Sequence, residues 1–247
     1  MSAIAKQMST SIGDSDDGDK LDYVTIFQTE DNIQIMLPEL GDRLALQAFF
    51  HYHNVKFIMD QRNNAEDMSP DGVLPFIRHG DKLISGYGKI VDYIRKKNNI
   101  EVQNRLEVEA LTILFNEVVN KSELFYTWLD KDIYEQFTKT RYSIGKPWPL
   151  NAFLCWLKKW DVSSKIGEAK NIDLDFENLC LELSDRLERF KKFIFGDKPC
   201  EVDTLIYGHI KAIYQNHDIY KNLYNIVEKF PNLIAFMKRI DEQIPKE

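Results

Sequence analysis

The sequence predicts a small α/β domain followed by an all-α domain. Short β-rich runs occur in the first part of the chain only, at 23–28, 55–59, 76–78 and 83–85. Beyond them, apolar residues recur at the three- and four-residue spacing of amphipathic helices. We therefore predict three segments along the chain: a tail at 1–20, an α/β domain at 21–99 and an all-α domain at 100–247.

Composition supports a sizeable core and excludes some partners. Of the 247 residues, 44% are apolar and 12% aromatic. A net charge of −7 argues against nucleic acid or an anionic lipid surface as the main partner. No stretch approaches the ~18–20 apolar residues that a spanning helix requires. An odd number of widely spaced cysteines argues against a disulfide framework and favours a reducing compartment: Cys155, Cys180 and Cys200.

The tail at 1–20 is small, polar and acidic, and we expect it to be disordered. It lacks the apolar segment of a secretory signal. Mitochondrial presequences are rich in Arg and poor in acid, whereas this tail has no Arg and carries an acidic run at 14–19. If the protein works at mitochondria, we expect it to do so from the cytosolic side, without a cleaved address.

The α/β domain begins with the strand at 23–28. Pro38 argues against a regular continuation, so we predict a loop at 31–41 and a helix capped by Asp42. Apolar residues then follow helical spacing up to the strand at 55–59, which completes a right-handed βαβ unit: Ala45, Ala48, Phe49 and Tyr52.

A turn sequence, Ser-Pro-Asp-Gly at 69–72, precedes Pro75 and an apolar run. Pro75 cannot donate to a sheet ladder. A Val-Leu-Pro step that opens a strand before a hairpin is typical of thioredoxin-like domains, so we predict a structural role for Pro75 and a cis Leu74–Pro75 bond. The alternative is an ordinary trans proline at a strand edge. The hairpin turn at 79–82 precedes a helix with Ile90, Val91 and Ile94 on one face.

In the all-α domain, proline and apolar spacing set the predicted helices. A long helix, or two with a kink, covers 108–129, and the prolines at 147–149 break the pattern. Further helices are predicted to begin at Asn151 as cap, to cover 176–190 and 203–214, and to start near Pro231.

Five stretches of this sequence resemble the metaxin family, and within it the second-paralogue type. They span almost the whole chain after the tail: 62–80, with its Val-Leu-Pro-Phe-Ile run, SGYGKIVDYI at 85–94, PWPL at 147–150, FGDKP at 195–199 and FPNLIAFMKRI at 230–240. The resemblance implies a glutathione-transferase-like fold, with a thioredoxin-like domain before the helical one.

The resemblance also implies a function. The chain would be a subunit of a mitochondrial outer-membrane complex, peripheral on the cytosolic face, linked to protein import and β-barrel assembly and to mitochondrial transport. Its implied partners are a larger, membrane-anchored metaxin paralogue in a heterodimer, the outer-membrane assembly machinery and mitochondrial motor-adaptor proteins. Membrane association would then be indirect.

Catalytic groups are missing where a glutathione transferase needs them. Such an enzyme uses a Tyr, Ser or Cys near the end of the first strand or the start of the first helix. Residues 27–42 contain none, with Thr29 as their only hydroxyl, and no Cys-x-x-Cys occurs. We therefore expect a non-catalytic adaptor without a cofactor. The alternatives are a soluble scaffold with no mitochondrial link, or an atypical transferase-like enzyme using Tyr23, Thr29 or Ser85.

Two helix starts carry predicted structural residues. Ser85 follows Ile84, where transferases have an acid or Gln that binds glutathione, and we expect Ser85 to act as a helix cap. Residues 200–203 resemble a capping box in which Cys200 replaces the hydroxyl and Asp203 is kept. The alternative for Cys200 is a reactive thiol at a helix N-terminus.

The five histidines do not cluster in the sequence, so we expect no metal site. An aromatic stripe, beside Lys158 and Lys159, allows two interpretations. Stripes at helical spacing usually face a core, which we favour. The alternative is a surface that contacts a protein or a membrane. The candidate contact residues are Trp148, Pro149, Phe153, Trp156 and Trp160.

Overall fold

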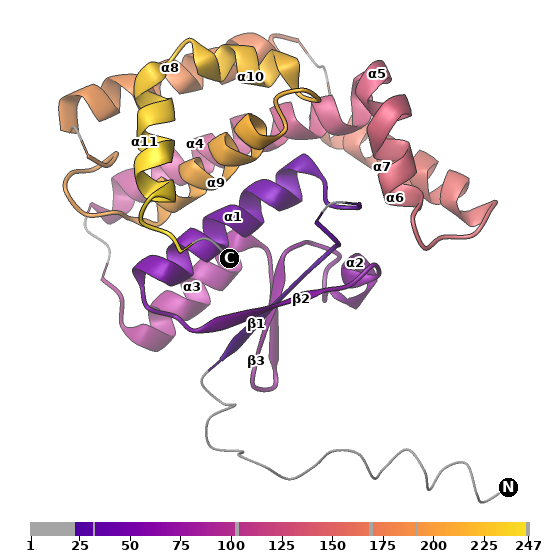
Figure 1. Cartoon of the computed structure of the whole chain (residues 1–247), viewed down its shortest axis with the longest axis horizontal. Helices are drawn as coiled ribbons and strands as arrows, with labels where there is room; N and C mark the ends of the chain where they lie inside the picture. Colours follow the sequence, from indigo (N-terminus) through magenta and orange to yellow (C-terminus); the bar gives the residue numbers. More distant parts are fainter. Residues whose placement is uncertain (1–22, 32, 102–103, 168–169, 191, 246–247) are drawn as a thin grey trace, which may run out of the picture.

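The structure is a computed structural model, and it places an α/β part beneath a group of helices (Figure 1). This order confirms the predicted fold class, whereas the domain boundary near residue 100 stays a prediction. The predicted tail at 1–20 lies outside the described residues, which are 23–31, 33–101, 104–167, 170–190 and 192–245.

One four-stranded sheet forms the α/β part of the described chain, in the order β2-β1-β3-β4. Its strands are β1 (Val24–Gln28), β2 (Phe57–Gln61), β3 (Phe76–His79) and β4 (Lys82–Ser85). β1 pairs with β2 in parallel and with β3 antiparallel. The helix α1 (Leu37–Tyr52) connects β1 to β2. Every residue of β1 is buried, as expected for a central strand covered on both faces.

Helix α1 begins earlier than predicted, which corrects the prediction that Asp42 caps it. The N-cap is Met36, and Pro38 lies in the first turn. A proline is tolerated there because the first-turn N–H groups have no partner within the helix. The Glu39 carboxylate accepts a hydrogen bond from the Met36 backbone N–H at 3.4 Å, which stabilises this start.

The loop before β3 has the predicted geometry at its proline. The Leu74–Pro75 bond is cis, and the Pro75 carbonyl accepts from the Gly86 N–H at 3.0 Å. A short helix that the pattern did not predict, α2 (Ala65–Met68), precedes this loop. Helix α3 (Tyr87–Asn98) follows β4.

The rest of the described chain is helical, apart from a single bridge between Phe193 and Gly196. The predicted helix at 108–129 is observed as an α-helix that ends in a π-helical turn. The short helix α10 was not predicted. The elements are α4 (Arg105–Leu124), η2 (Phe125–Leu129), α5 (Lys131–Ile133), η3 (Tyr134–Thr138), α6 (Lys139–Ser143), α7 (Leu150–Ile166), α8 (Ile172–Phe190), α9 (Glu201–Gln215), α10 (Lys221–Glu228) and α11 (Pro231–Asp241).

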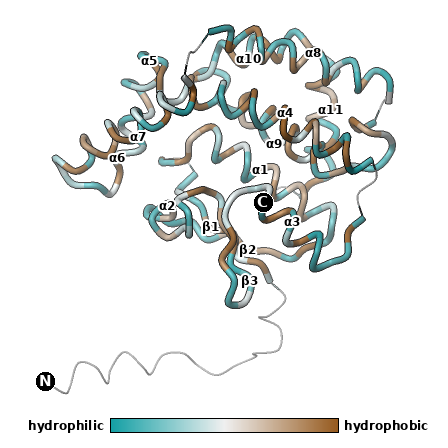
Figure 2. Tube along the Cα trace, turned by 180° about the vertical axis from the view of Figure 1, so that it is seen from behind, coloured by the Kyte–Doolittle hydropathy of each residue, from teal (hydrophilic) through white to brown (hydrophobic). Residues whose placement is uncertain are grey.

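Helix α9 is the centre of the molecule. It packs along α1 and also contacts α4 and α11, so it joins the α/β part to the helices (Figure 1). Apolar residues gather along α4 and α9, where the two helices face the interior (Figure 2). One contiguous core therefore runs through both parts. The segment from η2 to α7 forms a smaller core together with the first residue of α8: Trp128, Tyr134, Val162, Ile166 and Ile172.

Candidate functional site

The cleft after β1 is the place where a transferase would carry its thiol-activating group. Thr29 donates a hydrogen bond to Glu39 Oε2 at 3.3 Å. Burial, together with the charge of Glu66, raises the pKa of Glu39 to about 7. The Thr29 hydroxyl is therefore hydrogen-bonded to a carboxyl group. The ionised form of that carboxyl group would repel a thiolate at this position.

One side chain from the helical part and one from the loop after β1 close this cleft. Arg141 on α6 donates to the Ile35 carbonyl oxygen at 3.1 Å, and Gln34 donates to the Asn63 carbonyl oxygen at 3.0 Å. The cavity that remains has a volume of about 20 Å³. Such a volume holds about one water molecule, so a tripeptide does not fit in it.

Ser85 does not cap a helix, which corrects the prediction. It is the last residue of β4, and Gly86 takes the N-cap position of α3 with a φ of +79° that suits glycine. The Ser85 hydroxyl instead donates to Asp71, in the loop before Pro75. Lys89 Nζ pairs with the same carboxylate at 2.6 Å. The hydrogen bonds from Lys89 and Ser85 lower the pKa of Asp71 to about 2.

The three residues suggested for an atypical enzyme do not form one site. Tyr23 precedes β1 and Thr29 follows it, so the strand separates them. The Tyr23 ring is 40% exposed and lies 5.5 Å from Lys56 Nζ. Ser85 is engaged by Asp71. The described structure therefore gives none of these hydroxyls the surroundings of an activated catalytic group.

Asp203 fixes the start of α9 through two backbone hydrogen bonds. Its carboxylate accepts from the N–H groups of Ile194 and Cys200, both at 2.8 Å. Burial raises the pKa of Asp203 to about 6. Burial, with Asp203 beside the thiol, also raises the pKa of Cys200. These surroundings disfavour the reactive-thiol alternative, because a raised pKa suppresses the nucleophilic thiolate.

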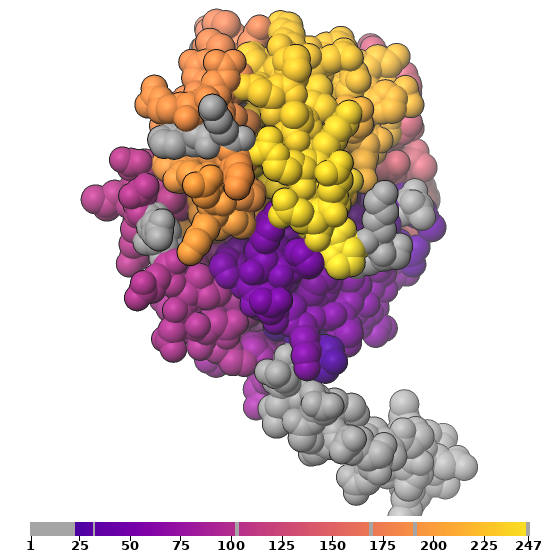
Figure 3. Space-filling model, turned by 60° about the vertical axis from the view of Figure 1, so that its left-hand side comes forward, coloured from indigo at the N-terminus to yellow at the C-terminus, as the bar shows by residue number. Residues whose placement is uncertain are grey.

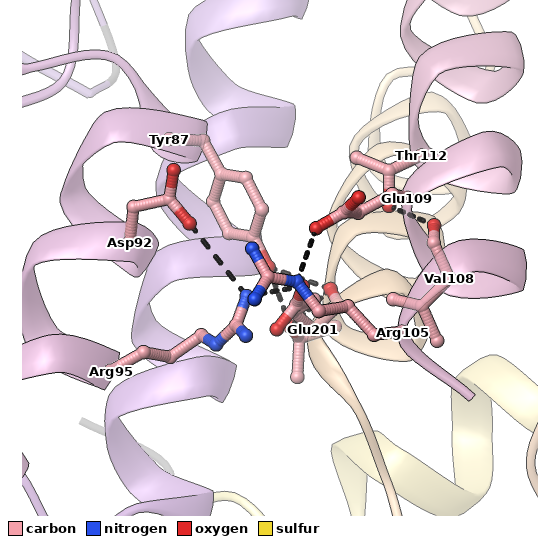
Figure 4. A network of polar contacts seen from close by, with 9 residues as sticks. Tyr87, Asp92, Arg95, Arg105, Val108, Glu109, Thr112 and Glu201 are labelled. Carbon is pink, nitrogen blue, oxygen red and sulfur yellow. Dashed lines mark hydrogen bonds and ion pairs between the residues drawn. The ribbon is translucent and has the colours of Figure 1, made fainter. Parts of the chain in front are cut away.

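A polar network next to this helix start ties α3 to α9 (Figure 4). The Tyr87 hydroxyl donates to the Glu201 carbonyl oxygen at 2.7 Å and lies 2.8 Å from the Thr204 hydroxyl. Arg95 Nη1 donates to Glu201 Oε1 at 2.9 Å, and both side chains are largely buried. Residues more than a hundred positions apart in the sequence thus hold the two parts together.

Sequence reasoning missed a deeply buried cluster of charged side chains, which lies between α1, α4 and α9. Glu123 and His209 are 0% and 2% exposed. His209 Nδ1 lies 2.9 Å from Glu123 Oε1, and Nε2 lies 3.3 Å from Asp42 Oδ1. Burial opposes a charge on His209, but Glu123 and Asp42 outweigh it and raise the pKa of His209 to about 10. The only sign of this cluster in the sequence was a histidine, His209, within the apolar run at 205–213.

Two glycines let α1 and α9 approach each other at this place. A Cβ on Gly41 would collide with the His209 ring. A Cβ on Gly208 would collide with backbone atoms of Gly41 and Ala45. The absence of side chains at both positions therefore sets the separation of the two helices.

Helix α7 exposes the aromatic stripe that sequence reasoning assigned to the core, and that interpretation is wrong. Phe153, Trp156 and Trp160 are 55%, 61% and 64% exposed. The rings of Phe153 and Trp156 stack with centroids 6.1 Å apart. We call the exposed apolar set the aromatic face of α7: Trp148, Leu150, Phe153, Trp156, Leu157 and Trp160.

The opposite side of α7 is held by the rest of the chain. Cys155, Val162 and Ile166 are buried. Lys158 pairs with Glu66 of α2 at 2.7 Å, and Lys159 Nζ lies 4.0 Å from the Tyr134 ring centroid. The aromatic face is therefore displayed by an anchored helix.

The entry into α7 carries the other two candidate contact residues. The Trp148–Pro149 bond is cis, and Pro149, rather than the predicted Asn151, is the N-cap of the helix. The Trp148 side chain is 82% exposed. All the candidate contact residues thus lie on one short segment of the surface.

Metal and membrane sites were searched over the described ranges. There, no group of three or more His, Cys, Asp and Glu side chains is arranged to hold a metal ion. Nor does any described helix combine the length and apolar character needed to cross a bilayer.

Two family descriptions match this chain. Residues 44–159 match the family described as outer mitochondrial membrane transport complex protein. Residues 176–240 match the C-terminal domain of glutathione S-transferases. The first match begins within α1 and ends within α7, and so includes most of the aromatic face.

Solved structures that resemble this chain are glutathione transferases. One from Phanerochaete chrysosporium has a TM-score of 0.62 at 10% identity, covering 91% of this chain and 98% of that one. A Pi-class enzyme from Onchocerca volvulus has a TM-score of 0.53 at 18% identity, covering 89% and 88%. These identities establish the fold alone, which is the predicted glutathione-transferase-like fold.

Sequence relatives are metaxins of both paralogue types. Human metaxin-2 is 32% identical over 230 residues, covering 88% of this chain and 87% of the relative. The Caenorhabditis elegans metaxin-2 homologue is 27% identical, covering 77% and 87%. Mouse metaxin-1 is 27% identical, covering 70% and 60%. The similarity to human metaxin-2 extends over nearly the full length of both proteins, and this chain therefore belongs to the metaxin family.

Proposed function

We propose that this chain is a non-catalytic adaptor subunit of a metaxin complex, on the cytosolic face of the mitochondrial outer membrane. It would bind a larger, membrane-anchored metaxin paralogue and so reach the membrane through its partner. Within the complex it would serve protein import and β-barrel assembly, and it would connect mitochondria to motor-adaptor proteins. The matched family description and the metaxin relatives support this placement.

The aromatic face of α7 is the observation that carries the adaptor role. Tryptophan is enriched among residues that dominate binding energy, and clusters of aromatic anchors mark such surfaces. Trp148, Trp156 and Trp160 are each more than 60% exposed. Exposed apolar patches of this kind mark interaction sites on soluble proteins. We propose that this face, with Pro149 at its edge, contacts the larger paralogue.

The closed cleft after β1 supports a non-catalytic role. Its remaining cavity of about 20 Å³ lies beside the Thr29–Glu39 hydrogen bond. A glutathione-dependent enzyme needs room for the tripeptide and a donor that stabilises the thiolate. The cleft instead offers a carboxyl group whose pKa burial raises to about 7.

The proposal is tested by affinity capture of the tagged full chain from mitochondria solubilised in mild detergent, with mass spectrometry of the eluate. We expect an anchored metaxin paralogue in near-equal amount. Recovery of the chain alone would contradict the heterodimer.

A glutathione titration of the same purified chain tests the non-catalytic role separately. We expect no saturable binding and no conjugation of a standard electrophile. Saturable binding that is lost in Ser85→Ala or Thr29→Ala would instead support the enzyme.

A further inference from the structure

A groove with no assigned role lies where α1, β2, α9 and the described C-terminal residues meet. Figure 3 shows the C-terminal part, in yellow, against the indigo and violet residues of the α/β part. The groove has a volume of about 570 Å³. Small-molecule sites in proteins have volumes of ~300–1,000 Å³, so one ligand of modest size fits here.

The floor of the groove is apolar. Leu44 and Phe50 of α1 are 8% and 0% exposed, and they belong to the main core. Partly buried Phe57 of β2 and Ile244 near the C-terminus continue this surface. Apolar side chains from three separate stretches thus line one continuous wall, which suits an alkyl chain.

The rim of the groove carries polar side chains that the described structure does not use. Lys56 is exposed and forms no ion pair with any described residue; its Nζ faces the Tyr23 ring at 5.5 Å. His51 and Asn54 line the same rim, and their side chains make no hydrogen bond within the described chain. His51 lies in the last turn of α1, and Asn54 and Lys56 lie in the connection from α1 to β2.

The charge of the lining is opposite to that of the protein. The groove contains three cationic residues, Arg43, Lys56 and Lys211, and one carboxylate, Asp241. Lys211 is paired with Asp241, and Arg43 lies 3.3 Å from Asp31. Lys56 therefore gives the rim a positive charge in a chain whose net charge is −7.

We propose that this groove binds a single-chain anionic amphiphile, namely a long-chain carboxylate. The carboxylate would lie at the rim, accepting charge-assisted hydrogen bonds from Lys56 and further ones from His51 and Asn54. The alkyl chain would lie along Leu44 and Phe57. This site is separate from the aromatic face of α7. A protein proposed to act by binding other proteins would thus also bind a lipid.

The class of ligand follows from the apolar floor and the polar rim taken together. A nucleotide would need several cations around its phosphates, whereas the lining offers one cation that is not engaged by a carboxylate, Lys56. A neutral lipid would leave the polar rim without an ionic partner. A carboxylate with one alkyl chain uses the apolar floor and the single cationic rim together.

Binding is tested by titrating the purified full chain with palmitate in an isothermal calorimeter. We expect one saturable site, with affinity rising from octanoate to laurate to palmitate because each added methylene is removed from water. The methyl ester of palmitate should bind about tenfold more weakly, since it lacks the charge that Lys56 contacts.

A charge-reversal pair distinguishes the groove from general electrostatics. Lys56→Glu should weaken palmitate binding about tenfold. Lys96→Glu is the matched control, because Lys96 is exposed on α3, outside the groove, and the change in net charge is the same. Its affinity should stay within about twofold of the unmodified chain.

Several outcomes would overturn the proposal. They are the absence of saturable palmitate binding, equal affinities for palmitate and its methyl ester, and equal effects of the two lysine substitutions. Circular dichroism of both variants, expected to match the unmodified chain, excludes misfolding as the cause of a lost signal. None of these outcomes depends on whether the chain captures a metaxin paralogue.

Discussion

Helices α9 and α7 have similar sequence patterns and opposite surroundings. Both place large apolar side chains at helical spacing. Helix α9 is enclosed by α1, α4 and α11, so its apolar run is buried. Helix α7 buries one side and displays Phe153, Trp156 and Trp160 on the other. Periodicity thus identifies the helix and the stripe, but it does not tell whether the same chain or another one covers the stripe.

The two helices also differ in what a substitution should change. The surroundings of α9 contain a buried charge network and close backbone approaches, on which the folded state depends. The aromatic face of α7 contributes little to folding, because most of its surface remains in water. Substitutions around α9 should therefore lower stability, and substitutions on α7 should lower binding.

The largest effect is expected for Glu123→Gln. It leaves the His209 charge buried with Asp42 alone, at 3.3 Å. Breaking one side of a buried charged pair costs ~3–5 kcal/mol. Urea unfolding of both proteins measures the loss. The matched control is Glu135→Gln, because Glu135 is 54% exposed and its solvent-screened pair with Lys139 should contribute little to stability. Equal stability of Glu123→Gln and the unmodified chain would contradict the proposed role of the network.

The same network should make stability depend on pH. His209 has a pKa of about 10 in the folded chain, against ~6.5 when unfolded. Its stabilisation is therefore complete below the unfolded value and is lost as the pH rises through the folded one. Burial raises the pKa of Glu123, which acts in the same direction.

Unfolding free energies at pH 6 and pH 10 provide the measurement. Each pKa unit is worth ~1.4 kcal/mol, so a loss on the order of a few kcal/mol is expected. The loss should be smaller in Glu123→Gln, where the main carboxylate partner is removed. An equal loss in both proteins would assign the pH dependence to other groups.

A smaller loss is expected for Gly208→Ala, since the added methyl group meets backbone atoms of α1 that cannot rotate away. Overpacking of this kind costs ~1–3 kcal/mol. Gly88→Ala on α3 is the control: a Cβ there meets no atom within 4 Å, and replacing a helical glycine should be neutral or stabilising by up to ~1 kcal/mol. Thermal unfolding compares the two, and a neutral Gly208→Ala would show that α1 and α9 adjust their separation.

The smallest effect on stability is expected on the aromatic face. Trp156→Ala and Trp160→Ala should each change the free energy of unfolding by less than ~0.5 kcal/mol, since both side chains are mostly exposed. Val162→Ala, on the buried side of the same helix, should cost more than ~1 kcal/mol. A large loss for either tryptophan would mean that the face stabilises the fold rather than a complex.

Sequence patterns predicted the features that depend on neighbouring residues. Strand composition placed the four strands within two residues, and the Val-Leu-Pro step predicted the cis bond at Pro75. Local rules also produced errors. Pro38 was predicted to lie in a loop before the helix, although the first turn of a helix accepts proline. Ser85 was assigned to the nearest helix start, although Asp71, fourteen residues earlier, accepts its hydrogen bond.

The features that escaped prediction join residues far apart in the sequence. Asp42, Glu123 and His209 meet only because α1, α4 and α9 fold together. Similarly, Arg141 closes the cleft after β1 from a helix more than a hundred residues away. By contrast, the sequence shows directly that no Tyr, Ser or Cys lies between Phe27 and Asp42, because this feature depends on one short segment alone.

The most direct test of the contrast between α9 and α7 is the affinity of the Trp156→Ala/Trp160→Ala double variant for the larger metaxin paralogue, measured beside its thermal unfolding. Loss of central aromatic anchors costs ~2 kcal/mol or more, about thirtyfold in affinity. Leu106→Ala, on α4, is the control because its side chain is 83% exposed outside the aromatic face. We predict that the double variant loses binding and keeps its unfolding temperature, whereas unchanged binding would contradict the assignment of this face to the partner.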